Sequence, residues 1–154
     1  MYLDYALDLA FVLRDIKRVA FSPEYGGVVI LFGLELIKSY DISSREEFLD
    51  AAFDIYSWLQ QEEPENLIYK LNELQITRRQ RTYSKDEKTL LLEEKTKNAN
   101  DNRVLCAINI LLENKSEAEF NFDKLTEAEK KEFVEYPIFT LAKQLGMFQN
   151  EILC

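Results

Sequence analysis

Residues that break regular backbone structure are rare in this chain: glycine occurs four times and proline three times among 154 residues. Glycine and proline most often end helices and form tight turns. A β-sandwich or barrel needs such turns every 8 to 12 residues or so. A chain this poor in them is expected to form long regular elements, and these are most simply helices.

Apolar residues recur at helical spacing through most of the chain. The clearest stripe lies in residues 48–59 and consists of Phe48, Ala52, Ile55 and Leu59. Acidic residues occupy the opposite side of the same segment, as expected for a helix with one buried face. Further stripes that predict helices lie in residues 2–20, 67–74, 104–112 and 126–145.

Several residues indicate where helices begin and end. Four Ser or Thr residues, each followed three positions later by Glu, match the capping-box pattern of helix starts. They are Ser44, Ser84, Ser116 and Thr126. Those at 44 and 126 precede the better apolar patterns and are the stronger candidates. Pro137 is expected to interrupt or re-cap the last helix, and Gly146 to end it.

Residues 28–37 form an apolar run that fits either a helix or a strand. Its first half has strand propensity, whereas its second half and its helical neighbours favour a buried helix, which we expect. A turn is expected before it, at residues 25–27. The prediction is an all-α single domain over residues 1–154, an irregular bundle of about six to seven helices. A short β-hairpin near residues 25–42 is the alternative.

The chain is acidic, with a formal net charge of −9 and a pI of about 4.7. This charge disfavours binding to nucleic-acid phosphates and to membrane surfaces, and it favours a basic protein partner. The longest apolar run is about half the length of a membrane span, and no secretory signal is visible. Cys106 and Cys154 form neither a disulfide framework nor a zinc-binding spacing. These features predict a cytoplasmic protein.

Charge is distributed unevenly along the chain. Residues 41–75 hold nine acidic and two basic residues, whereas residues 76–103 hold eight basic and five acidic ones. Carboxylates that share a helix face in the first stretch could contact a basic partner, and clustered arginines in the second could grip carboxylates or phosphates. The candidate partner-binding residues are Glu46, Glu47, Asp50, Asp54, Trp58, Glu62, Glu63, Arg78, Arg79 and Arg81. The alternative is a solvated helix face followed by a solvated basic linker.

The absence of histidine from the sequence limits the chemistry. It excludes Ser-His-Asp and Cys-His catalysis, histidine-ligated zinc and the commonest general base. The glycines match neither a P-loop nor a dinucleotide fingerprint. Asp86, Glu93 and Lys95 match a metal-dependent nuclease pattern only loosely, because that pattern needs a strand over residues 88–96. The sequence therefore predicts no enzyme activity, no cofactor and no metal.

Three functions follow from these features. The first is a small acidic protein that neutralises a basic partner, as bacterial immunity proteins and antitoxins neutralise toxins. This expectation rests on composition, since no motif identifies a family. The second is a phage or plasmid DNA mimic that inhibits a nucleic-acid enzyme. The third is a Mg²⁺-dependent nuclease-like enzyme that uses Asp86, Glu93 and Lys95.

Overall fold

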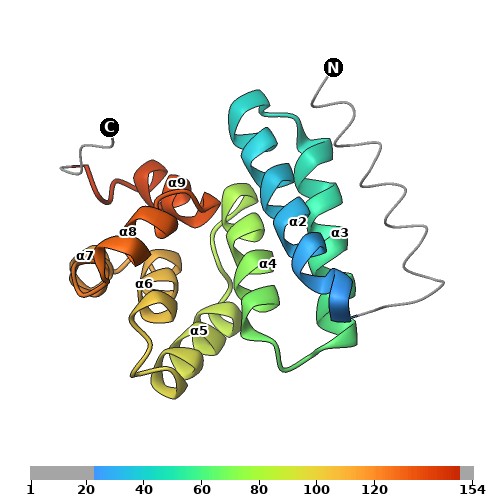
Figure 1. The fold of residues 1–154 in the computed structure, drawn as a ribbon. Helices are drawn as coiled ribbons and strands as arrows, with labels where there is room; N and C mark the ends of the chain where they lie inside the picture. The colour runs from blue at the N-terminus through green and yellow to red at the C-terminus, as the bar shows by residue number, and fades with distance from the viewer. Residues whose placement is uncertain (1–22, 150–154) are drawn as a thin grey trace. The chain divides into compact units, whose positions relative to one another are not determined.

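The computed structural model describes residues 23–149, with side chains from residue 29 onward. All regular secondary structure in this range is helical, in eight helices without a strand (Figure 1). The all-α prediction is confirmed, whereas the predicted six to seven helices are too few. The helix expected over residues 2–20 lies outside the described residues. The chain divides into two compact units, one ending at Ile76 and one beginning at Thr77. One domain over residues 1–154 remains a prediction.

The first unit is built on two antiparallel helices, α2 (Pro23–Ser43) and α3 (Glu46–Glu62). They pack side by side in Figure 1. Ser44, between them, adopts a φ of 59°, and its N–H donates to the Tyr40 carbonyl at 2.7 Å. A left-handed residue in this position commonly ends a helix. The helix α4 (Leu67–Gln80) begins in this unit.

The β-hairpin considered for residues 25–42 is wrong, and so is the turn expected at residues 25–27, because α2 runs through both. The buried residues Val29, Leu36 and Ile37 belong to one core cluster with Phe48 of α3. Their spacing places them on one side of a helix, whereas a strand would send alternate residues to opposite faces. Packing against α3 therefore overrides the strand propensity of the β-branched run.

Gly33 allows α2 and α3 to approach closely. A Cβ atom at this position would lie 2.6 Å from Cζ of the Tyr56 ring. Tyr56 is fully buried, and its hydroxyl donates to the Ile30 carbonyl at 2.7 Å. Burial raises the pKa of Tyr56 well above its ordinary value. The hydroxyl therefore stays protonated and keeps the hydrogen bond that its burial requires.

The second unit contains the end of α4 and five shorter helices. These are α5 (Lys85–Lys97), α6 (Asn102–Leu111), α7 (Lys115–Asp123), α8 (Glu127–Phe133) and α9 (Pro137–Gln144). Four buried phenylalanines form the aromatic part of its core, with contacting ring centroids 4.9 to 6.2 Å apart. They are Phe122, Phe133, Phe139 and Phe148. Such separations are typical of packed aromatic pairs.

Two of the four predicted capping boxes are confirmed. Ser84 accepts a hydrogen bond from the Glu87 N–H at 3.2 Å, and Thr126 accepts one from the Glu129 N–H at 3.1 Å. The box at Ser44 is wrong, because a left-handed residue lacks the extended backbone of an N-cap. The box at Ser116 is also wrong, since this residue lies inside α7.

The ends of α9 agree with the sequence. Pro137 occupies the first turn, where its missing N–H has no cost. Gly146 follows the helix with a φ of 89°. The N–H groups of Gly146 and Met147 donate to the carbonyls of Lys143 and Ala142 at 3.0 and 2.9 Å. This is the hydrogen-bond pattern of a Schellman motif, so the predicted stop at Gly146 is confirmed.

Candidate functional site

The helix α3 carries the largest net charge among the helices of the described part of the chain. This helix contains five acidic residues and no basic one. One side of it is fully buried at Phe48, Ala52 and Leu59. The amphipathic pattern thus fixes which side faces the solvent. The acidic face, as we define it, consists of Glu46, Glu47, Asp50, Asp54 and Glu62.

The carboxylates of the acidic face lie mostly at the surface. Glu46, Glu47, Asp50 and Glu62 are exposed, and Asp54 is half-buried. Glu46 and Glu47 occupy the first turn of α3, where negative charge interacts favourably with the helix dipole. Arg45, just before the helix, pairs with Glu47 at 3.4 Å. Both side chains of this pair are exposed to solvent, so the pair reduces the negative electrostatic field of the acidic face only a little.

Phe53 lies on the same side of α3 as Glu46 and Asp50, although other aromatic residues of this helix are buried. Its side chain is 36% exposed, whereas Trp58 is half-buried and packs against the core of the first unit. Helical spacing explains the difference, because Phe53 is five residues from Phe48 and so points away from the stripe. An aromatic ring among carboxylates offers a contact surface that no local sequence pattern marked.

Glu63 is set apart from the acidic face by its position at the end of α3. Its N–H donates to the Leu59 carbonyl at 2.9 Å, and its carboxylate accepts from the Asn66 amide at 3.2 Å. The pKa of Tyr69 is raised, first by burial and then by a hydrogen bond to Glu63. These contacts tie Glu63 to the connection between α3 and α4.

All three candidate arginines belong to the second unit, and each contacts another group of that unit. Arg78 and Arg79 lie in the last turn of α4, so the linker considered for this stretch is partly helical. Arg78 pairs with Glu113 at 3.3 Å, and the Arg79 guanidinium donates to the Pro137 carbonyl at 2.9 Å. These contacts join the end of α4 to residues far along the chain.

Arg81 makes the most complete of these ion pairs. Its two Nη atoms donate to the two carboxylate oxygens of Glu87 at 2.7 and 2.9 Å. Glu87 also completes the capping box with Ser84. The hydrogen bond from Arg81 is the main cause that lowers the pKa of Glu87 to about 2. The bidentate contact therefore fixes the connection from α4 to α5.

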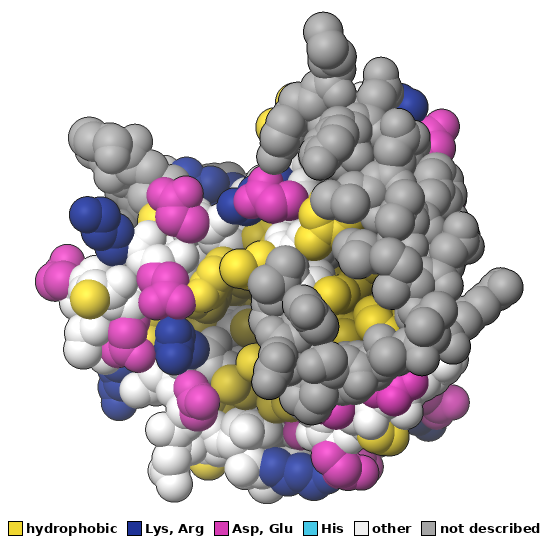
Figure 2. All heavy atoms as spheres, turned by 45° about the vertical axis from the view of Figure 1, so that its right-hand side comes forward, with side chains coloured by type: hydrophobic (Ala, Val, Ile, Leu, Met, Phe, Trp, Pro, Cys, Tyr) yellow, Lys and Arg dark blue, Asp and Glu magenta, His cyan; other side chains and the backbone are white. Residues whose placement is uncertain are grey.

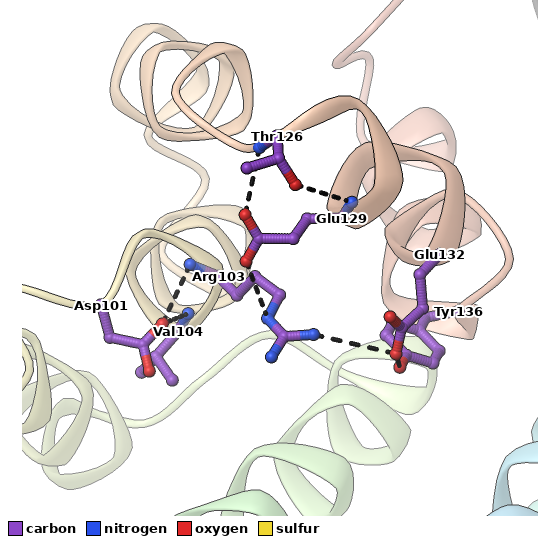
Figure 3. A network of polar contacts seen from close by, with 7 residues as sticks. All are labelled: Asp101, Arg103, Val104, Thr126, Glu129, Glu132 and Tyr136. Carbon is purple, nitrogen blue, oxygen red and sulfur yellow. Dashed lines mark hydrogen bonds and ion pairs between the residues drawn. The ribbon is translucent and has the colours of Figure 1, made fainter.

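A second polar network joins α6 to α8 (Figure 3). Arg103 lies 3.7 Å from a carboxylate oxygen of Glu129 and 3.7 Å from one of Glu132. Hydrogen bonds within the Thr126 capping box lower the pKa of Glu129. Glu132 also accepts a hydrogen bond from the Tyr136 hydroxyl. Both carboxylates thus have partners within the unit, and no sequence pattern linked Arg103 to them.

The residues of the nuclease-like pattern lie on a helix. Asp86, Glu93 and Lys95 all belong to α5, which covers the segment where that pattern needs a strand. Lys95 pairs with Glu117 of α7. Among residues 23–149, no cluster of three or more acidic or cysteine side chains is arranged to hold a metal ion. The strand on which that pattern depends is therefore not present in the described residues.

Cys106 is a buried thiol in the second unit. Its sulfur donates to the Ala118 carbonyl at 3.4 Å, and burial raises its pKa to about 12. A thiol that stays protonated at neutral pH is a poor nucleophile. Its role in the described structure is packing between α6 and α7.

Two further observations concern possible membrane-spanning helices and similarity to known proteins. None of the helices described between residues 23 and 149 is long and apolar enough to span a membrane. Comparisons with protein-family models, with curated proteins and with solved structures find no match to this chain.

Proposed function

We propose that this protein binds a basic protein partner through the acidic face of α3. The observation that carries the proposal is the concentration of charge: residues 46–65 contain seven acidic residues and no basic one. Four of the five acidic-face residues are exposed. Such a surface attracts a positively charged protein and raises the rate of association.

The aromatic residues of α3 add a second element to the proposal. Charge pairs at the rim of an interface mainly affect association, whereas desolvated aromatic side chains supply much of the affinity. Phe53 is 36% exposed beside the acidic face, and the half-buried Trp58 lies five residues further along the helix. The partner would place basic side chains over Glu46, Glu47 and Asp50 and an apolar contact over Phe53.

The functional consequence we propose is neutralisation of the partner by occlusion, as immunity proteins and antitoxins do. Occlusion requires charge and shape complementarity, and it requires no catalytic group on this chain. Glu63, Arg78, Arg79 and Arg81 have intramolecular contacts in the described structure. They therefore contribute less to this proposal than the acidic face does, although the sequence marks them as candidates.

A matched pair of variants tests the proposal. The variant E46Q/E47Q/D50N/E62Q removes four negative charges from the acidic face. The control D86N/E93Q/D123N/E135Q removes four from exposed positions in the second unit. Tagged wild-type protein and both variants are used to capture proteins from native lysate, with mass spectrometry of the eluate. We expect one basic protein with the wild type and the control, and its loss at high salt.

Retention of the same partner by the acidic-face variant would contradict the proposal, as would the absence of any basic partner at low salt. The control also addresses the nuclease-like alternative, because it neutralises Asp86 and Glu93. If the purified wild-type protein shows Mg²⁺-dependent nuclease activity and only the control variant loses it, the nuclease-like function would be supported in place of the binding proposal.

The DNA-mimic alternative is favoured by one feature of α3. Glu46, Asp50 and Asp54 recur every four residues, which spaces them about 6 Å apart along the helix axis. A regular row of carboxylates can imitate a row of phosphates. If the captured partner is a nucleic-acid enzyme, duplex DNA should displace it from this protein. A partner that binds DNA and this protein together would exclude mimicry.

A further inference from the structure

The outward side of α2 exposes two large apolar residues, although this helix already buries its opposite side. Leu31 is 60% exposed and Ile42 is 82% exposed, whereas Val29, Leu36 and Ile37 are buried. On the face drawn in Figure 2, hydrophobic, acidic and basic side chains of the described residues are interspersed. Large apolar side chains that a helix exposes opposite its buried side can mark a contact with another chain. The exposed side of α2 is therefore a candidate surface for binding another protein chain.

Four residues form a straight stripe on this side: Leu31, Glu35, Lys38 and Ile42. At 3.6 residues per turn they fall within about 60° of one another around the helix. Their spacing of four, three and four residues is the spacing of the seam positions in a coiled coil. Glu35 and Lys38 are paired at 3.3 Å, with side chains 48% and 38% exposed.

The stripe is complementary to itself when two copies run antiparallel. A two-fold axis that passes between residues 36 and 37 places Leu31 opposite Ile42 of the second copy. The same axis places Glu35 opposite Lys38 of the second copy. Each copy thus offers the other an apolar contact at both ends and an opposite charge in the middle. A two-fold interface of this kind requires such self-complementarity.

We propose that α2 is a homodimerisation helix that pairs with α2 of a second copy in this antiparallel register. The two apolar layers supply attraction, while the Glu35–Lys38 pairs set the register and orientation. The interface is short, so the dimer is weak and forms at high protein concentration. The inference does not depend on the proposed function, because the acidic face belongs to α3.

Net charge opposes this association and sets the conditions of the test. Residues 23–76 carry eleven acidic and three basic residues, so two copies repel each other. The stripe itself is neutral, with one residue of each sign. At physiological salt the Debye length is about 8 Å, which screens the distant carboxylates more than the paired groups in the seam.

Sedimentation velocity of the full chain from micromolar to near-millimolar concentration tests the proposal. We expect a monomer–dimer equilibrium in the wild type. E35K and K38E should each raise the dissociation constant about tenfold, because each puts like charges opposite one another twice. An equimolar mixture of E35K and K38E should regain the wild-type dimer, since each copy then meets its complement.

The mixture distinguishes a charge pair between two chains from a charge pair within one chain. Neither variant has its own Glu35–Lys38 pair, so a dimer regained in the mixture must come from contacts between the two variants. I42D should abolish the dimer, whereas I68D, at another exposed apolar position of the same unit, should leave it unchanged. Thermal melting at low concentration checks that every variant folds. A wild type that is monomeric at all concentrations would overturn the proposal. So would a dimer that E35K leaves unchanged, or a mixture no better than the single variants.

Discussion

The two units of this chain use charge in opposite ways. Residues 23–76 contain eleven acidic and three basic residues, whereas residues 77–149 contain thirteen of each. In the second unit the charges link helices: Arg81 binds Glu87, and Arg103 binds Glu129 and Glu132. In the first unit most of the acidic face points to the solvent. Balanced charge thus serves internal contacts, whereas unbalanced charge leaves a negative electrostatic field at the surface.

The cores of the units differ as well. The first unit buries mainly aliphatic residues around Tyr56 and Phe48, with Gly33 allowing close helix contact. The second unit buries four contacting phenylalanines among short helices. Short helices have few internal hydrogen bonds and depend more on packing and on their caps. We therefore expect the units to respond differently to substitutions in the core and at helix ends.

The largest expected effect comes from truncating a core aromatic residue. Phe139→Ala should lower the free energy of unfolding of the second unit by about 3–5 kcal/mol, because Phe139 is 1% exposed. Phe48→Ala is the matched change in the first unit, because the Phe48 side chain is 0% exposed. Hydrogen exchange followed by mass spectrometry should show lost protection mainly in the unit that carries the substitution. Equal loss across both units would instead support the single cooperative domain that the sequence predicts.

A smaller effect is expected where α2 and α3 approach. Gly33→Ala should lower the free energy of unfolding by about 1–3 kcal/mol, since the added methyl group would overlap the Tyr56 ring. This loss should exceed the gain in helix propensity of about 1 kcal/mol. Tyr56→Phe removes the hydroxyl near that methyl group, so the double variant should lose less than the two single losses combined. Chemical denaturation measures all three, and strict additivity would contradict the close contact.

The helix caps give the next effect and contrast the units directly. Ser84→Ala and Thr126→Ala should each lower stability by about 1 kcal/mol, because each removes a confirmed cap. Ser44→Gly should raise the stability of the first unit by up to about 1 kcal/mol, because glycine adopts a φ of 59° without strain. Thermal melting tests both changes. A loss of stability in Ser44→Gly would restore the sequence-based interpretation of Ser44 as an N-cap.

The smallest effect concerns pH and the Arg81–Glu87 pair. The pKa of Glu87 lies at about 2 in the folded chain, below its ordinary value of 4.5. A lowered folded pKa means that the contribution to stability is complete above pH 4.5 and disappears as the pH falls towards 2. Glu87→Gln should therefore lower stability at pH 7, by less than the cap substitutions do, and lose this difference at pH 2. A difference that persists at pH 2 would show that the ion pair is not its origin.

Local patterns in the sequence predicted the features that depend on neighbouring residues. The stripe from Phe48 to Leu59, the boxes at Ser84 and Thr126, and the stop at Gly146 all involve residues within a few positions of one another. Their physical causes are helical periodicity and hydrogen bonds to the nearest backbone groups. The acidic side of α3 was also predictable, because a buried stripe determines which side remains outside.

Only the tertiary structure decided the features that join distant residues. Residues 28–37 have propensities that fit a helix or a strand, and contact with α3 selects the helix. Arg81 and Arg103 are indistinguishable from solvated basic residues until their carboxylate partners are placed beside them. Asn109 is likewise a polar residue whose partner is distant in the sequence. It is buried, and its side-chain amide donates a hydrogen bond to the Asn121 side-chain oxygen at 2.8 Å. The sequence alone thus determined where most of the helices form and which side of α3 is charged. The fold determined which charges are paired, because pairing depends on distances that local sequence does not encode.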